Sequence, residues 1–285
     1  MSGPSFLRNP APAIQQGRRP IGVSSLGQID PWRLSLLHDR PDNVLIWITR
    51  GQGRIVINGV RRGFGAHNAM FLPAGTLFAL EPGAQCLGLV VQSPAGLTGR
   101  LPREALHLRV RDGVAQAELT TEIEAMQREF TKDRILLQDA LDAHVRLLAV
   151  WLHRQVAAGT TDASGKETAG QRLVRAYAKA LTRSYASDRG VADYAGELGM
   201  TATHLTRACR AACGRTAVEM LTERKLHEAR CLLSQPQPPV NRVAAALGFH
   251  SAPYFTRFIR THTGVSPSEL RRGARPPARR TAPVR

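Results

Sequence analysis

The chain has 285 residues, 43% of them hydrophobic, and its 39 Lys and Arg against 22 Asp and Glu give a net charge of +17. This length suffices for two domains, and no apolar run approaches the ~18 residues that would span a membrane. The Pro- and Arg-rich N-terminus has no apolar segment of the kind a secretory signal needs, so we expect a cytoplasmic protein. The four cysteines form no disulfide framework, in keeping with a reducing compartment.

The positive charge is concentrated in the C-terminal part of the chain. Residues 170–285 hold 20 Lys and Arg against 7 Asp and Glu, a net charge of +13, whereas residues 1–169 carry only +4. A generally basic chain would not show this asymmetry. The distribution favours a phosphate-binding surface in the C-terminal part.

Residues 1–30 are rich in Pro, Gly and Arg, which predicts an irregular N-terminal arm. An arm that folds over a ligand or a partner is the alternative. Residues 31–95 read as β structure, with apolar strands separated by Gly and Pro and with Asn58-Gly59 as a strong hairpin turn signal. The expected strands are 44–49, 54–58, 69–72, 77–80 and 86–91. This spacing predicts a sandwich or small β-barrel, which can enclose one small ligand.

Residues 115–157 change to a helical period and predict two helices joined near Lys132-Asp133. One apolar stripe consists of Leu119, Ile123, Met126 and Phe130. The other consists of Leu137, Leu141, Val145, Leu148 and Leu152, with Trp151 beside it. The stripes can pack on their own barrel or on a second subunit. We favour a dimer interface, because paired DNA half-sites call for a symmetric protein.

A small, polar segment at 158–170 predicts a flexible linker and the domain boundary. The expected domains are therefore 31–157 and 171–272, followed by a basic, disordered tail at 273–285. Within the second domain we expect a helix at 172–185 and a long helix at 216–233, which ends before a Pro-rich stretch. At 1.5 Å per residue this long helix is a rod of about 27 Å.

The rod lies between two copies of one pattern. The first copy contains Val191, Ala195, Leu198, Gly199, Thr201, Leu205, Thr206, Arg207 and Gly214. The second contains Val240, Ala244, Leu247, Gly248, Ser251, Phe255, Thr256, Arg257 and Gly264. In each copy a glycine suits the left-handed end of a helix and a hydroxyl residue suits the start of the next. Each copy therefore predicts a helix-turn-helix unit.

On a helical wheel, four residues of each second helix point away from the core. They are Thr203, Thr206, Arg207 and Arg210 in the first copy, and Pro253, Thr256, Arg257 and Arg260 in the second. Arginine forks match guanine edges, threonine offers a hydroxyl and a methyl to bases, and proline gives apolar contact. A solvated charged face is the ordinary reading of a single basic helix, but two copies in register favour DNA-reading residues.

Cys209 and Cys213 lie one turn apart, towards the packed side of the first of these helices. Core packing is the favoured interpretation, and a redox or metal role is the alternative. A tetrahedral zinc site needs four ligands, and no second pair of ligands lies nearby in the sequence. We therefore expect no metal and no cofactor.

Several segments of the C-terminal part resemble the DNA-binding domain of AraC/XylS-type transcriptional regulators. They are Arg224-Lys225-Leu226, Ala229, Leu232-Leu233, Val243-Ala244, Gly248-Phe249, Tyr254-Phe255-Thr256-Arg257-Phe258, and Thr263-Gly264-Val265-Ser266-Pro267-Ser268-Glu269-Leu270-Arg271. The resemblance covers 172–272. It implies seven helices, two helix-turn-helix units joined by one long helix, and reading helices that carry the eight residues selected above.

The N-terminal half is similar in outline to the cupin-like sensor domain of that family, through its strand order, its Gly-rich turns and Phe71-Leu72-Pro73-Ala74-Gly75. The resemblance places the family's dimerisation helices at about 115–157. The His-x-His pattern of metal-binding cupins is missing, because His38 stands alone and His67 is isolated. Weak candidates for an effector site are Arg33, His38, Trp47, Arg54 and His67.

The sequence therefore predicts an α+β protein of two domains, a cupin-like β-barrel domain with two helices and an all-α domain with two helix-turn-helix motifs. We expect a DNA-binding transcriptional activator in a bacterial nucleoid, a homodimer that meets RNA polymerase at promoters and senses a small molecule of unknown identity. An effector-independent regulator, whose barrel only dimerises, is the alternative. An enzyme is disfavoured, because the ligands of a metal oxygenase are missing. An alkyl-transfer repair protein would need four cysteines for zinc and a nucleophilic cysteine, and Cys86 is the sole cysteine of the N-terminal half.

Overall fold

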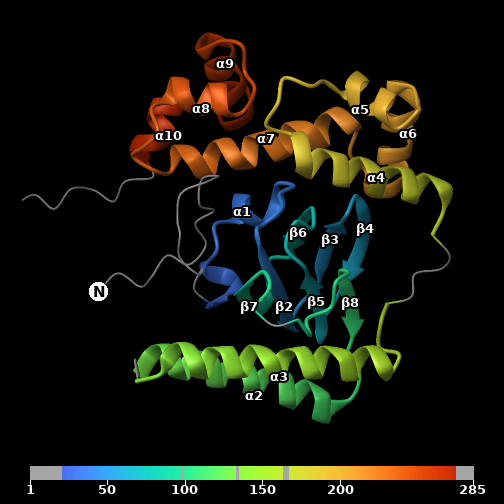
Figure 1. Ribbon diagram of the computed structural model, residues 1–285, viewed down its shortest axis with the longest axis vertical. Helices are drawn as coiled ribbons and strands as arrows, with labels where there is room; N and C mark the ends of the chain where they lie inside the picture. Colours follow the sequence, from blue (N-terminus) through green and yellow to red (C-terminus); the bar gives the residue numbers. More distant parts are fainter. Residues whose placement is uncertain (1–20, 98, 133–134, 163–166, 274–285) are drawn as a thin grey trace, which may run out of the picture.

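The computed structural model describes residues 21–97, 99–132, 135–162 and 167–273. Figure 1 shows three layers: a β domain in the middle, the long helices α2 and α3 on one side of it, and the helices α4 to α10 on the other. The predicted fold class, a β domain with two helices followed by an all-α domain, is confirmed.

The β domain consists of two antiparallel sheets. The five-stranded sheet has the order β1 (Gly22–Ser25), β7 (Leu87–Pro94), β2 (Asp42–Arg50), β5 (Asn68–Leu72) and β8 (Leu106–Arg109). The three-stranded sheet has the order β4 (Val60–Phe64), β3 (Gly53–Ile57) and β6 (Phe78–Pro82). Asn58 and Gly59 join β3 to β4 with φ values of 49° and 77°, so the predicted hairpin turn is confirmed.

The prediction of an irregular arm at 1–30 is wrong for its last part. Residues 22–25 pair with β7, and Ile21, Leu26 and Ile29 are buried in the β domain. A short 3₁₀ turn, η1 (Leu26–Gln28), and the helix α1 (Pro31–Ser35) follow. The pattern was missed because four residues with two serines carry too little apolar alternation to identify a strand. Residues 1–20 lie outside the described part of the chain.

The two sheets face each other across an apolar interior that their own side chains fill. Ile46, Ile48, Ile55, Met70 and Leu80 are among its fully buried members. The expectation of a barrel with room for one small ligand is therefore not met between the sheets.

The predicted helical pair is present as α2 (Gly113–Lys132) and α3 (Leu137–Ala157). Both apolar stripes pack on the outer face of the five-stranded sheet and on each other, in one cluster with Trp47 and Phe71. The indole N–H of Trp47 donates to the Thr120 hydroxyl at 3.0 Å, and that of Trp151 donates to the Ala115 carbonyl at 3.0 Å. The stripes are thus buried within their own chain, so a dimer contact has to use other residues of these helices.

The prediction of a flexible linker at 158–170 is wrong at both ends. Thr161 forms a β-bridge with Leu108 of β8, and the Asp162 N–H donates to the His107 carbonyl at 2.7 Å. The helix α4 (Ala169–Ser184) begins three residues earlier than expected, because Thr168 and Gln171 form a capping box at its start. Residues 163–166 lie outside the described part.

The described C-terminal part continues with α5 (Val191–Glu197), α6 (Ala202–Cys213), α7 (Ala217–Leu233), α8 (Val240–Ala246), α9 (Ala252–Thr263) and α10 (Pro267–Gly273). The seven helices that the resemblance implies are therefore present. In Figure 1, α5 and α6 lie beside one end of α7, and α8 and α9 lie beside the other. Each group has its own apolar cluster, around Tyr194 and Leu205 in the first and around Val243 and Phe255 in the second.

Candidate nucleic-acid interface and domain joint

Both helix-turn-helix units form as the sequence predicts. Gly199 and Gly248 lie in the turns directly after α5 and α8, and their φ values are 67° and 72°. The Thr201 hydroxyl then accepts from the His204 N–H at 3.2 Å at the start of α6, and the Ser251 hydroxyl accepts from the Tyr254 N–H at 3.3 Å at the start of α9. Each second helix is therefore fixed at its N-terminus by a local cap.

We call eight outward-facing residues the reading residues, after the role that the sequence predicts for them: Thr203, Thr206, Arg207, Arg210, Pro253, Thr256, Arg257 and Arg260. Both threonines at 206 and 256 are half-buried, and the other six are exposed. Leu205 and Phe255 are fully buried behind them. The order of buried, half-buried and exposed positions is the same from 201 to 210 as from 251 to 260. The two helices therefore present the same face to solvent.

His204 and Tyr254 occupy a further exposed position that the two helices share, and the sequence reasoning missed it. Each lies directly after the first reading residue of its helix. Aromatic and imidazole rings can contact bases or sugars, so these two side chains extend the candidate interface. Comparing every exposed position of the two copies, rather than one arc of the wheel, would have found them.

The rod α7 separates the two units, as predicted. It has 17 residues, which at 1.5 Å per residue makes it about 25 Å long. Thr216 and Glu219 close a capping box at its start, with hydrogen bonds of 3.0 and 2.6 Å. A continuous, capped helix holds the units at a fixed separation.

The same helix covers one end of the β domain, and no sequence signal that we used indicated this contact. The buried Arg224 pairs with Asp39 of the β domain at 2.5 Å and with Glu228 at 3.0 Å, under the ring of Tyr185.

A second set of ion pairs lies at the start of the same helix. Arg215, in the turn before α7, pairs with Glu81 of β6 and with Glu223, each at 2.8 Å. The Leu37 N–H also donates to Glu223 at 3.1 Å. We name this contact zone the domain joint.

A signal for the domain joint was present in the sequence. Arg224, His227 and Glu228 are three polar residues at i, i+3 and i+4, on one face of a helix that otherwise buries apolar residues. A polar cluster of this kind needs partners, because a buried charge without one is costly. The partners come from residues more than 180 positions away, so the sequence pattern alone did not identify them.

Two of the five effector candidates meet at the domain joint. Arg33 and His38 line an enclosed cavity of about 20 Å³ with Arg40, Gln92, His227 and Cys231, over an apolar floor that includes Val44, Ile46 and Phe78. His38 stacks on His227 of α7, with ring centroids 4.1 Å apart. Burial lowers the pKa of His38 to about 3 and holds that of His227 well below its usual range, so both rings are neutral at neutral pH.

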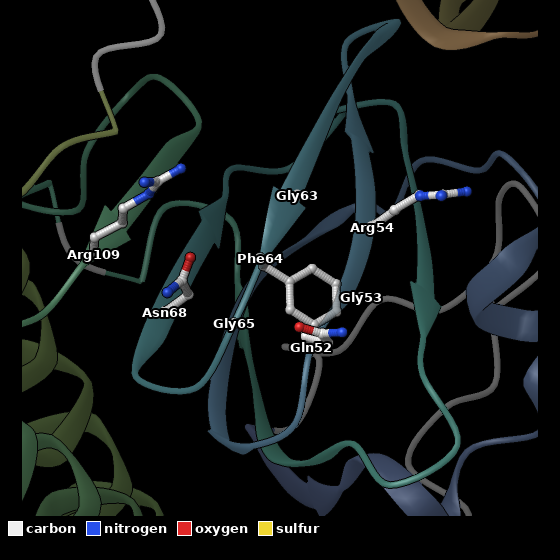
Figure 2. Close-up of a pocket in the computed structure, with 8 residues that line it drawn as sticks. All are labelled: Gln52, Gly53, Arg54, Gly63, Phe64, Gly65, Asn68 and Arg109. Atoms are coloured by element: carbon white, nitrogen blue, oxygen red, sulfur yellow. The ribbon is translucent and has the colours of Figure 1, made fainter.

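The other three candidates lie elsewhere. Trp47 faces α2 in the apolar cluster between the five-stranded sheet and the helices α2 and α3. His67 stacks on it, with ring centroids 5.9 Å apart. Arg54 is exposed and lines an open pocket of about 560 Å³ between the edges of the two sheets (Figure 2). Its other lining residues include Gln52, Phe64, Asn68 and Arg109, and Figure 2 shows the Arg54 side chain directed away from the Phe64 ring. The five candidates therefore form no single site.

The cysteines of the described part are free thiols. Cys209 and Cys213 are buried in the core of the first unit, and burial raises the pKa of the Cys209 thiol to about 12. A thiol with so high a pKa is a poor nucleophile and a poor metal ligand. Among the described residues, no group of three or more His, Cys, Asp or Glu is placed to hold a metal ion. Core packing is therefore the better interpretation of this pair.

Comparison with known sequences identifies the C-terminal domain. Residues 194–273 match the family model of a helix-turn-helix domain. The arabinose operon regulatory protein of Escherichia coli K12 is 29% identical over 87 residues, a match that spans 30% of this chain and 30% of that protein. The C-terminal part of the chain is therefore a helix-turn-helix domain similar to that of an AraC-type regulator, and it matches less than a third of that protein's length.

Solved structures similar to this chain include ToxT of Vibrio cholerae. An apo variant of ToxT is 15% identical, with 88% of this chain and 96% of that chain covered and a TM-score of 0.44. A ToxT structure with a bound unsaturated fatty acid is 12% identical, with coverages of 90% and 97% and the same score. The C-terminal domain of AraT, a response regulator from Geobacillus stearothermophilus, is 21% identical over 41% of this chain and 95% of that one, with a TM-score of 0.35.

None of the helices in the described part of the chain has the length and apolar character that crossing a bilayer requires.

Proposed function

We propose that the regulator reads promoter DNA with the eight reading residues of α6 and α9, one helix in each of two successive major grooves. The matched exposure of the two helices carries this proposal. Arg207, Arg210, Arg257 and Arg260 are suited to guanine edges and phosphates, and α7 sets the distance between the helices. His204 and Tyr254 stand at the border of the same surface.

The test is substitution of the matched arginines. Arg207→Ala or Arg257→Ala should cost about 1–3 kcal/mol on a duplex selected by the wild-type protein from a random pool, and should relax the preference at the bases contacted. Arg128→Ala removes one exposed positive charge from α2 and should leave both quantities unchanged. Equal losses on the selected duplex and on random DNA would show that Arg207 and Arg257 do not read bases.

We propose further that 31–157 and 171–272 are two domains that move relative to each other, and that a small-molecule effector acts at the domain joint. The cavity there is walled by both parts of the chain, with Arg33 and His38 on one side and His227 and Cys231 on the other. At about 20 Å³ it has room for roughly one water molecule. A larger ligand has to part α7 from the β domain, so its binding favours a different arrangement of the reading helices.

The small size of this cavity and the filled interior of the β domain also support the second candidate function, a regulator without an effector. A thermal-shift screen of the full chain against metabolites separates the two functions, because a ligand that binds only the folded state raises the melting temperature. Under the effector proposal, some ligands raise it, and Arg33→Ala weakens that response. Under the alternative, no metabolite shifts the melting temperature and DNA binding is constitutive.

Activation of transcription requires the regulator to sit beside RNA polymerase at a promoter in the bacterial cytoplasm, bound to the nucleoid. Two copies joined through α3 would present four reading helices to paired half-sites. The apolar stripe of α3 is buried on its own sheet, so the contact has to use the outer face, where Leu147 is 54% exposed. Asp139 lies near one end of α3 and Arg154 near the other, so an antiparallel pair of α3 helices brings opposite charges together.

A further inference from the structure

Gly214 lies at the end of the reading face of α6. On a helical wheel at 100° per residue, positions 203, 207, 210 and 214 fall on one side, so Gly214 continues the row of Thr203, Arg207 and Arg210 by one turn. It has a φ of 79° and caps the helix by donating its N–H to the Arg210 carbonyl at 2.9 Å. As a glycine, it adds no side chain to the row.

A side chain from the β domain lies at this place instead. Arg61, on β4, is exposed, and its Nη1 lies 3.1 Å from where a Cβ of Gly214 would stand. Its Cζ lies 3.6 Å from the same point. No hydrogen bond or ion pair joins the Arg61 guanidinium to any part of the chain that the structure describes, so its N–H donors are available to an external acceptor.

The second unit offers an internal comparison. Gly264 ends α9 as Gly214 ends α6, with a φ of 77° and an N–H that donates to the Arg260 carbonyl at 2.9 Å. Apart from its chain neighbours and the backbone of its own helix, no atom of the described residues lies within 4 Å of the position that a Cβ of Gly264 would take. The two units therefore differ at the end of the reading face: among the described residues, a cation of the β domain lies beside Gly214 and none lies beside Gly264.

The position of Arg61 suits a phosphate rather than a base. A helix rises 1.5 Å per residue, so Gly214 lies about 6 Å along the axis beyond Arg210. The major groove is about 12 Å wide and is bordered on both sides by phosphates. With the middle of the reading face in the groove, the end of that face comes to the groove wall. An exposed guanidinium there pairs well with phosphate oxygens.

We propose that Arg61 contacts a DNA phosphate at the end of the α6 reading face, so that the β domain forms part of the DNA interface of the first unit. This inference rests on the proposed reading role of α6. It also supplies a link between sensing and binding, because a shift of β4 relative to α6 adds or removes one phosphate contact without altering the reading residues.

Docking the two domains is the other role open to Arg61, since a cation near the C-terminus of a helix is favourable there. The two roles predict different salt dependence. Each phosphate contact contributes about −0.9 to the slope of log Kobs against log salt concentration. If Arg61 only docks the two domains, its removal can change the affinity for DNA but leaves this slope at the wild-type value.

The experiment measures the DNA-binding constant of the full-length protein at salt concentrations from about 50 to about 200 mM. The wild type, Arg61→Ala, Arg61→Lys and Arg103→Ala are compared. The probes are a 40-base-pair duplex of random sequence and a duplex that the wild type selects from a random pool. Arg103 is an exposed arginine beside α3, on the opposite side of the β domain, so Arg103→Ala is the control for net charge.

Arg61→Ala should weaken binding to both duplexes by the same factor, several-fold, and reduce the slope by about 0.9. Arg61→Lys should retain most of the slope, and Arg103→Ala should match the wild type. A wild-type slope for Arg61→Ala would overturn the proposal and leave Arg61 as a docking residue. A loss confined to the selected duplex would overturn it as well, because phosphate contacts carry no sequence information.

Failure of the proposed reading role is a separate result. If Arg207→Ala leaves the sequence preference intact, α6 does not read bases, whatever the slope of Arg61→Ala. Melting temperatures of all variants show whether a loss of affinity reflects folding. Should Arg61→Ala be less stable than the wild type, Arg61→Gln, which keeps the length of the side chain and removes its charge, replaces it in the same comparison.

Discussion

At the scale of single residues, the two turn glycines Gly199 and Gly248 look equivalent in the sequence but differ in the structure. Both have a positive φ. Around Gly199 there is open space for a side chain, whereas a Cβ at Gly248 would lie 2.2 Å from the Ser187 carbonyl carbon and oxygen. Gly248 therefore meets two requirements, a left-handed backbone and close contact with the α4–α5 turn.

Alanine substitutions separate these requirements. Gly199→Ala should lower the free energy of unfolding by roughly 1–2 kcal/mol, the cost of the left-handed conformation. Gly248→Ala should lower it by roughly 2–5 kcal/mol, because the methyl group also displaces the backbone at Ser187. Denaturant unfolding monitored by circular dichroism measures both. Similar losses for the two variants would mean that the Ser187 contact is unimportant.

At the scale of elements, α7 has two roles that require different faces. It spaces the two helix-turn-helix units, and it covers the end of the β domain through Arg224, His227 and Glu228. Burial of His38 and His227 against each other makes the domain joint sensitive to acid. A histidine whose pKa is lowered on folding binds its proton more readily in the unfolded state, so folded stability falls as the pH decreases.

The pH range of this loss of stability follows from the pKa of His38 in the unfolded and the folded chain. An unfolded histidine has a pKa of about 6.5, and that of His38 in the folded chain is about 3. Stability attributable to His38 is therefore complete above about pH 6.5 and is lost as the pH falls towards 3, by up to about 1.4 kcal/mol per pH unit. His38→Gln should make the decline in melting temperature from pH 7 to pH 4 shallower.

The control for this prediction is His250→Gln, since His250 is exposed beside α9. It should leave the pH dependence unchanged. Carboxylates titrate over part of the same range, so the comparison between variants, rather than the decline itself, isolates the histidine. Parallel curves for His38→Gln and the wild type would show that the stack of His38 on His227 does not contribute.

At the scale of the whole molecule, the β domain is enclosed by helices on two sides, and each side serves a different proposed contact. The α4–α10 side carries the proposed DNA surface and the domain joint, and the α2–α3 side carries the proposed dimer surface (Figure 1). The two surfaces lie on opposite sides of the β domain. Dimer formation therefore leaves the reading residues open, and the β domain is the part of the chain through which the two can influence each other.

The dimer prediction depends on Leu147. Leu147→Glu should raise the dissociation constant of the dimer at least about tenfold, because it places a charge in the apolar centre of the α3 contact. Sedimentation velocity over a range of protein concentrations measures this. Val218→Glu is the matched control, since Val218 is 56% exposed at the start of α7, and it should leave the dimer intact. If the wild type and Leu147→Glu sediment identically, the dimer contact does not involve Leu147.

Local patterns in the sequence determined much of this protein. The spacing of Leu119, Ile123 and Met126 predicted α2, the Asn58-Gly59 turn predicted the β3–β4 hairpin, and the caps at Thr201 and Ser251 predicted the reading helices. These predictions succeeded because hydrogen bonding, amphipathic periodicity and turn conformation act over a few residues. Because the helix-turn-helix pattern occurs twice, each copy supported the structure predicted from the other.

Only the tertiary structure decided how the parts meet. The strand β1 forms because β7 offers it an edge, and the stripes of α2 and α3 are buried because the outer face of the five-stranded sheet is apolar. The pairing of Arg224 with Asp39 and the approach of Arg61 to Gly214 join residues far apart in the chain. A charged side chain can find its partner on any neighbouring surface, and periodicity does not specify which surface that is. The domain joint and the end of the reading face therefore became visible only once the chain was folded.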